Sequence, residues 1–160
     1  MAHGVGVRPG CHRRRPLSPL STRRHLEMQQ KFARSYDSLK EIYDFAESVL
    51  DSADVAEAVR YPVHFAVEEL FTNMVKYNPG NDHEISLVVE TDDANVTVTM
   101  IDYDVEAFDV SARREVDTES PLEKRPVGGL GLHLIRHMVD SLNYHYADRQ
   151  SKITFTKGLS

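Results

Sequence analysis

The residues best suited to chemistry lie in a glycine-rich stretch, residues 126–140, which reads PVGGLGLHLIRHMVD. It contains Gly128, Gly129 and Gly131, and apolar residues at helical spacing follow, which predict a helix over residues 131–140. Because glycine lacks a Cβ, the backbone there can approach a ligand closely. The free N–H groups at a helix start favour an anion. The stretch therefore predicts a phosphate site, and an ordinary turn before a helix is the alternative.

A second group of polar residues lies in VEELFTNMVKY, residues 67–77. Glu69 and Asn73 are four residues apart and Lys76 follows three later, so all three share one face of a helix. The amide oxygen of Asn73 suits Mg²⁺, and the Glu69 carboxylate can orient or deprotonate a hydroxyl. The Lys76 ammonium can hold a phosphate as a point charge. For this helix taken alone, a solvated surface is the alternative.

Asp102 is the third candidate, at the end of the strand-like run TVTMID. Its carboxylate can accept a hydrogen bond from an exocyclic amine such as that of adenine, and Phe108 lies nearby in sequence as apolar cover. A carboxylate that caps a strand end is the alternative.

The elements that must position these groups begin with helices. Residues 29–36 predict a short edge strand, and Asp37 or Ser38 can cap the helix that follows. Apolar residues at helical spacing give that helix one buried face: Leu39, Ile42, Tyr43, Ala46, Val49 and Leu50. A short helix then runs to Arg60. Pro62 fits the first turn of the next helix, which is predicted to end near Tyr77.

The period then changes from helical to alternating. Residues 83–90 and 96–100 predict two strands joined by a hairpin at 92–95, and residues 103–127 predict a long loop that is either a functional lid or disordered. Two further strands are predicted around 142–147 and 153–156. We therefore expect an α+β fold, a two-layer α/β sandwich with helices on one face of a mixed, mainly antiparallel sheet.

Length and composition narrow the class of protein. The 160 residues suffice for one domain with a core, and the single cysteine, Cys11, excludes an intrachain disulfide. Residues 1–27 hold six arginines and one acid and predict a disordered basic tail, whereas residues 28–160 predict an acidic folded domain. An acidic body argues against nucleic acid. No apolar run reaches the length of a membrane span, so we expect a cytoplasmic protein that binds neither nucleic acid nor a membrane.

The three groups, in this order, resemble the boxes of the GHKL ATPase superfamily, which has the Bergerat ATP-binding fold. Glu69 and Asn73 resemble its N-box, Asp102 with Phe108 resembles its first glycine box, and Gly128-Gly129-Leu130-Gly131-Leu132 resembles its second. Within that histidine kinase-like superfamily, the short chain is similar to the anti-sigma factor serine/threonine kinases. The resemblance covers about residues 29–157.

The resemblance implies a site for ATP and Mg²⁺ between helices and lid. It assigns the metal to Asn73, the catalytic base to Glu69 and the adenine contact to Asp102. The glycine stretch, including Leu130 and Leu132, would lie at the phosphates together with Lys76. The implied protein partners are a small anti-sigma factor antagonist, phosphorylated on serine, and a sigma factor; dimers among family members imply a homodimer.

One residue departs from the family pattern. The first glycine box usually reads Asp-x-Gly, and here it reads Asp102-Tyr103-Asp104. A non-glycine residue at positive φ costs roughly 1–2 kcal/mol, and an added carboxylate repels phosphate at short range. This departure favours the alternative of a non-catalytic, nucleotide-gated or nucleotide-free protein-binding module. A chaperone-like ATPase fragment is a third hypothesis, which the absence of a transducer segment in this sequence disfavours.

Overall fold

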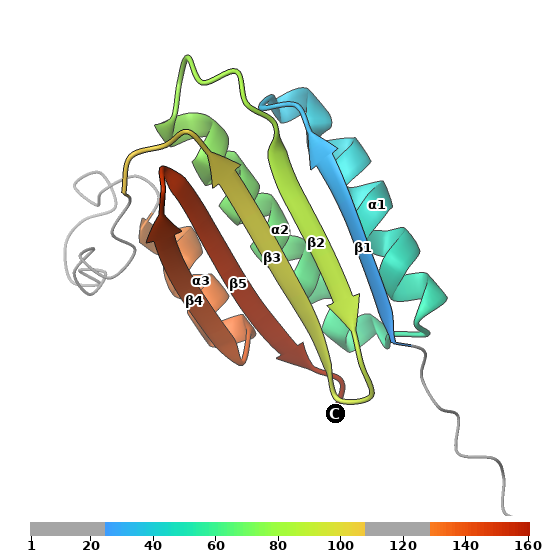
Figure 1. The fold of residues 1–160 in the computed structure, drawn as a ribbon. Coiled ribbons are helices and arrows are strands. Elements are labelled where there is room, and N and C mark those ends of the chain that lie inside the picture. The colour runs from blue at the N-terminus through green and yellow to red at the C-terminus, as the bar shows by residue number, and fades with distance from the viewer. Residues whose placement is uncertain (1–24, 108–128) are drawn as a thin grey trace, which may run out of the picture.

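A computed structural model describes residues 25–107 and 129–160, and shows a sheet with all its described helices on one face (Figure 1). The sheet has five strands in the order β1-β2-β3-β5-β4. Every strand pairing among the described residues is antiparallel. The predicted α+β sandwich is confirmed, although these pairings are antiparallel throughout rather than mixed. Within the same residues, no helix has the length and apolar character that crossing a membrane requires.

The elements follow the predicted order along the chain. They are β1 (Leu26–Phe32), a 3₁₀ turn η1 (Tyr36–Ser38), α1 (Leu39–Ser52), α2 (Glu57–Tyr77), β2 (Ile85–Thr91), β3 (Asn95–Tyr103), α3 (Gly129–Met138), β4 (Ser141–Ala147) and β5 (Gln150–Gly158). The edge strand therefore begins and ends earlier than the predicted range 29–36. The last helix starts at Gly129, two residues before its predicted start.

The core lies between the helices and the inner face of the sheet. Buried residues recur every three or four positions on α1 and α2, so each helix presents one apolar stripe to the sheet. Alternate residues of β2, β3 and β5 meet these stripes. The largest buried side chains are Phe32, Leu50, Phe71, Ile85, Leu87, Met100, Ile135 and Phe155. This packing fixes α2 across the middle of the sheet.

The prediction of a separate helix ending at Arg60 was wrong, because α2 is continuous through Pro62. A proline has no N–H to donate and disfavours a helix interior. Here the apolar stripe continues on both sides of it, with Val59 and Val63 buried. Burial of that stripe outweighs one missing hydrogen bond, so tertiary packing overrides the local breaker.

Two details of α1 also differ from the prediction. Ser38 is the N-cap residue of α1, as predicted, but its side chain makes no capping hydrogen bond; the hydroxyl of Ser35 caps the 3₁₀ turn η1 before it, accepting from the Asp37 N–H. Ser38 instead donates its hydroxyl to the Ala33 carbonyl at 2.9 Å. Tyr43, predicted in the buried face, is 52% exposed and stacks on His64 of α2 at 4.1 Å between ring centroids. An aromatic ring satisfied by a neighbouring helix needs no place in the core.

Both described hairpins have recognisable turn chemistry. Asp92 closes the β2–β3 turn by accepting the N–H groups of Ala94 and Asn95, each at 2.7 Å. Asp148 and Arg149 join β4 to β5, with φ of 51° and 60°. Two positive φ values in a two-residue loop match the right-handed twist of the paired strands. The second turn is relevant to the site, because it holds the Arg149 side chain at the end of the sheet where β3 finishes.

An ion-pair cluster joins α1 to the N-terminal half of α2. Glu47 accepts hydrogen bonds from His64 at 2.7 Å and from Arg60 at 2.5 Å. The bond from His64, supported by Arg60, holds the pKa of the Glu47 carboxyl below its ordinary value although partial burial opposes this. Because the pKa of Glu47 is lower in the folded state, its ion pairs stabilise the fold fully above the pKa of the unfolded state. This stabilisation is lost as the pH falls through the pKa of the folded state.

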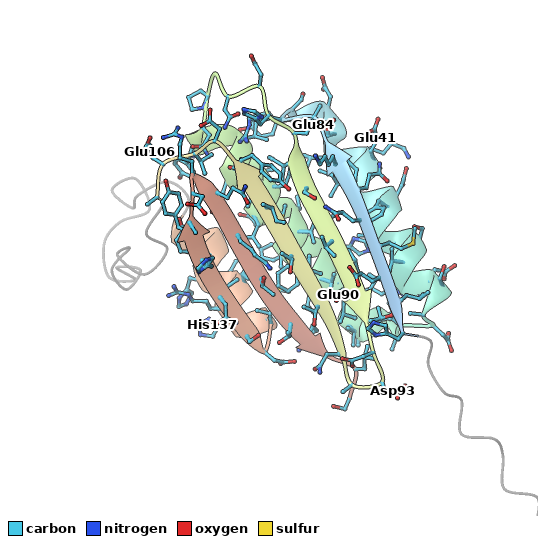
Figure 2. The ribbon with its side chains drawn as sticks, in the orientation of Figure 1. Glu41, Glu84, Glu90, Asp93, Glu106 and His137 are labelled. Carbon is cyan, nitrogen blue, oxygen red and sulfur yellow. The ribbon has the colours of Figure 1, made fainter. Side chains whose placement is uncertain are left out.

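We therefore expect Glu47→Gln to lower the free energy of unfolding at pH 7, with the difference from wild type shrinking between about pH 5 and pH 3. Urea denaturation at a series of pH values measures this difference. The control is Glu41→Gln, since Glu41 is an exposed glutamate on the same helix (Figure 2). A Glu47→Gln deficit that stays constant down to pH 3 would contradict the assignment.

Candidate functional site

The glycine-rich segment meets α2 at Glu69. A Cβ at Gly131 would lie 2.9 Å from Glu69 Cδ and closer still to Glu69 Oε2, so any side chain there would displace this carboxylate from its position. The structure therefore brings together two of the three groups identified in the sequence. Glu69 is only partly buried, so its carboxylate lies at the boundary between the two helices and solvent.

Asn73 and Lys76 follow Glu69 on α2. Asn73 is half-buried, whereas Lys76 is exposed and its Nζ lies 5.3 Å from the centre of the Tyr77 ring. The neighbouring residues Leu70, Phe71 and Met74 are buried in the core. The polar stripe predicted for this helix is thus present, on the side that does not face the sheet core.

Asp102 occupies the end of β3 and is almost completely buried, with 2% of its side chain exposed. Its partner is Arg34, which follows β1 and has 5% of its side chain exposed. Arg34 Nη2 donates to Asp102 Oδ1, and Nη1 donates to Oδ2 at 3.3 Å. Asn78, at the end of α2, adds a hydrogen bond from Nδ2 to Oδ2 at 3.0 Å. Three donors from two segments therefore fix this carboxylate.

The same guanidinium also reaches the backbone of α2. Arg34 Nη1 donates to the Met74 carbonyl at 2.9 Å. Met74 is the residue after Asn73, so the Arg34–Asp102 pair contacts α2 one residue beyond Asn73. Glu69 and Met74 are separated by five residues, or roughly 8 Å of helix. The described parts of all three groups identified in the sequence thus lie beside roughly the last two and a half turns of α2, from Glu69 onwards.

Arg34 keeps one donor without a partner among the described residues, because its Nε is buried and unbonded. A buried donor left unpaired costs about 1–3 kcal/mol. The contacts with Asp102 and Met74 therefore hold this guanidinium in place, although not all of its N–H groups are hydrogen-bonded.

Arg34 and Asn78 are the site residues that the sequence did not identify. Asn78 lies just past the predicted helix end near Tyr77, and Arg34 carried no signal within its own segment. Arg34 and Asp102 are 68 residues apart in the chain. An arginine after an edge strand and an aspartate at a strand end become informative only when the strand order is known.

Asp104, which stands where the family pattern has glycine, does adopt positive φ, at 54°. Its carboxylate accepts from Arg149 Nε at 2.6 Å, and this hydrogen bond holds the pKa of Asp104 below its ordinary value. Arg149 also donates to Glu106 at 2.6 Å. Glu106 and Glu84 lie at the end of the sheet where β3 finishes, opposite the hairpin that carries Asp93 (Figure 2).

Some of the remaining candidate residues lie in the described part of the chain and others do not. Gly129 and Leu130 form the first turn of α3, and Leu132 is buried in the core. Gly128 and Phe108 lie outside the described residues, as does most of the loop predicted over residues 103–127. Their predicted roles at the phosphates and over the adenine remain predictions.

The donor set fits a magnesium ion carried by a phosphate ligand better than a resident metal. Among the described residues, no group of three or more His, Cys, Asp and Glu side chains is gathered to hold a metal ion. Mg²⁺ commonly takes one or two protein oxygens and completes its shell with water and phosphate. The half-buried amide of Asn73 suits such a role.

These features define a class of protein: a two-layer sandwich in which a polar helix face, a buried strand-end aspartate and a glycine-rich helix start meet at one end of a helix. The chain matches the family described as histidine kinase-like ATPase domain over residues 32–157, which is most of its length. The protein belongs to this family, as the sequence resemblance indicated.

Solved structures support the same fold. The chain is similar to the structure of the RsbU and RsbW domains of Rv1364c from Mycobacterium tuberculosis, with a TM-score of 0.61 and 12% sequence identity. The match covers 82% of this chain and 31% of that one, so this chain spans about a third of the larger protein. A search of the curated proteins finds no match.

The buried ion pair gives a stability prediction. Asp102→Ala leaves the Arg34 guanidinium buried without its counter-charge, which we expect to lower the free energy of unfolding by roughly 3–5 kcal/mol. Urea denaturation measures the change. The double variant Arg34→Met/Asp102→Leu removes both charges and should recover much of the loss. An Asp102→Ala protein as stable as wild type would show that the pair is not formed in solution.

Proposed function

We propose that the protein is an ATP-dependent serine/threonine kinase of the anti-sigma factor type, whose substrate is a small anti-sigma factor antagonist. The observation that carries the proposal is the contact between Glu69 and Gly131, which sets the candidate base directly against the glycine-rich start of α3. The family match to ATPase domains supports ATP as the nucleotide.

In this proposal the chemistry is mainly positioning and charge neutralisation, as is usual for phosphoryl transfer. Glu69 accepts the proton of the substrate serine hydroxyl while the serine oxygen bonds to the γ-phosphorus. The bond between that phosphorus and the bridging oxygen breaks, and ADP leaves. Asp102 would accept a hydrogen bond from the adenine amine, and Lys76 with the backbone of the glycine stretch would hold phosphate.

Asn73 would hold Mg²⁺ through its amide oxygen, and the ion would neutralise charge on the phosphate oxygens when bound. The partners in this proposal are the antagonist and a sigma factor, in the cytoplasm, and the active form is a homodimer. The similar solved structure includes an RsbW domain, and this likeness supports a regulatory role of that type.

A second candidate function is a nucleotide-gated binding module without catalysis. The observation that favours it is Asp104, which places a carboxylate where the family pattern has glycine. Calorimetry with ADP and Mg²⁺ separates the two proposals when combined with a transfer assay. Heat of binding without phosphorylation of any antagonist would favour the module.

The kinase proposal predicts that Glu69→Gln lowers phosphotransfer from ATP to a purified antagonist by roughly 10²–10⁴-fold, because the general base is lost. Transfer of labelled phosphate measures it, and the affinity for ADP should change little. The matched control is Glu68→Gln, since Glu68 is exposed and faces Tyr43 and His64 on the other side of α2. Equal loss in both variants, or no transfer by wild type, would count against the proposal.

Gly131→Ala tests the contact itself. The new methyl group displaces the flexible end of Glu69 rather than backbone, and alanine favours a helix over glycine by up to about 1 kcal/mol, so stability should be kept or raised. Transfer should fall because the base has moved. Adding Gly131→Ala to Glu69→Gln should then cost little more, since the two changes act through one carboxylate. Fully additive losses of phosphotransfer would show that Gly131 and Glu69 act independently.

A further inference from the structure

Helix α3 carries two histidines that the proposed site does not use. His133 and His137 are four residues apart, so they are neighbours on one face of the helix. Their imidazole rings lie 4.3 Å apart between centroids, with an angle of 52° between the ring planes. His133 is half-buried and His137 is exposed, at the edge of the molecule formed by β4 (Figure 2). The two rings therefore lie against each other at a position that solvent can reach.

The backbone determines which ring nitrogen of His137 is free. Its Nδ1 lies 2.8 Å from the backbone carbonyl oxygen of His133. A carbonyl oxygen can only accept a hydrogen bond, so Nδ1 carries the proton and is the donor. In a neutral imidazole the free lone pair then belongs to Nε2. A metal-ligating histidine usually has this arrangement, since it donates one ring N–H to a carbonyl or carboxylate and binds the ion through the other nitrogen.

We propose that His133 and His137 form a binding site for a divalent transition-metal ion, Zn²⁺ in the first place, with one imidazole nitrogen from each residue and water in the other coordination positions. Two histidines at i and i+4 on a helix can present their imidazoles to one zinc ion. Imidazole suits Zn²⁺, Ni²⁺ and Cu²⁺, whereas Mg²⁺ prefers oxygen ligands. The site is therefore distinct from the magnesium position proposed at Asn73, and the inference does not rest on the proposed function.

The donor set makes this an open site rather than a closed structural one. Among the described residues, no third His, Cys, Asp or Glu side chain joins the pair. Structural zinc sites have four protein ligands, so an ion held by two histidines keeps positions for water and exchanges more readily. A bound ion links one turn of α3 to the next, and thereby stabilises the helix that carries Gly131 in its first turn.

The alternative is that His137 only satisfies a carbonyl near the end of α3, as basic side chains often do at helix ends. That role predicts a contribution to stability that is the same with and without metal, and it gives His133 no part. The response of the two histidines to zinc is therefore the informative quantity.

The experiment titrates Zn²⁺ into the full chain at about pH 7.5, where a free imidazole is mostly neutral, with Mg²⁺ present throughout. The chain has eight histidines, so NMR of the imidazole groups is used to follow each one separately. Thermal unfolding measures the stabilisation that binding produces. The variants are His133→Gln and His137→Gln, because glutamine is polar and favours a helix. His145→Gln is the matched control, since His145 is exposed on β4 and follows Tyr144, which packs against the core.

We expect Zn²⁺ to shift the signals of His133 and His137 together, and to raise the melting temperature of wild type and of His145→Gln. Either pair variant should bind Zn²⁺ at this site at least roughly tenfold more weakly, because half of the protein ligands are lost. Zinc that shifts neither signal, or that stabilises His137→Gln as much as wild type, would overturn the inference. A His137 signal that titrates unchanged in His133→Gln would overturn it too, and the same shifts with Mg²⁺ alone would refute the assigned class of ion.

Discussion

The structure depends on a buried charge pair that links the ends of two non-adjacent strands of the sheet. Phe32 of β1 is opposite Ile85 of β2, and Ser86 is opposite Ile101 of β3, so the end of β1 lies two strands away from Asp102. That separation is about 10 Å, which the long side chain of Arg34 helps to bridge. Removing both charges from water is costly, so the pair is stable only with its extra hydrogen bonds. Asn78 and the Met74 carbonyl supply these bonds, and the pair thereby ties β1, β3 and α2 together.

Helix α2 is the element to which each group of the site is attached. Its apolar stripe is held by the sheet through the whole length of the helix, including the turn that contains Pro62. A helix fixed in this way positions Glu69, Asn73 and Asn78 with the precision of the core rather than that of a loop. The Glu69 carboxylate lies against the helix α3 in this position because Gly131 has no side chain. The geometry of the site is therefore a consequence of core packing plus one missing methyl group.

Much of the fold could be predicted because periodicity reports burial directly. Alternation in β2 and β3, and the stripe on α1, follow from which face meets the core. The errors occurred where a local signal competed with packing, as at Pro62 and Tyr43. In the site, Glu69 and Asn73 could be found because helical spacing relates them. Arg34 and Arg149 could not, because Arg34 reaches a carboxylate two strands away and Arg149 one at the end of the neighbouring strand, and such contacts depend on strand order rather than on neighbouring residues.

Asp104 was expected to weaken a nucleotide site for two physical reasons, strain and charge, and the structure bears on each. The strain is real, since φ is 54°, although aspartate tolerates this region better than most residues. The charge is only partly compensated, because Arg149 bonds both Asp104 and Glu106; His83 lies 3.8 Å from Asp104. Arg149 is available there because the β4–β5 turn places two residues at positive φ beside the end of β3, where its carbonyl also accepts from Val105. The aspartate and the arginine therefore belong to one local solution, in which a paired carboxylate replaces glycine, and the pairing lowers its repulsion of a phosphate without removing it.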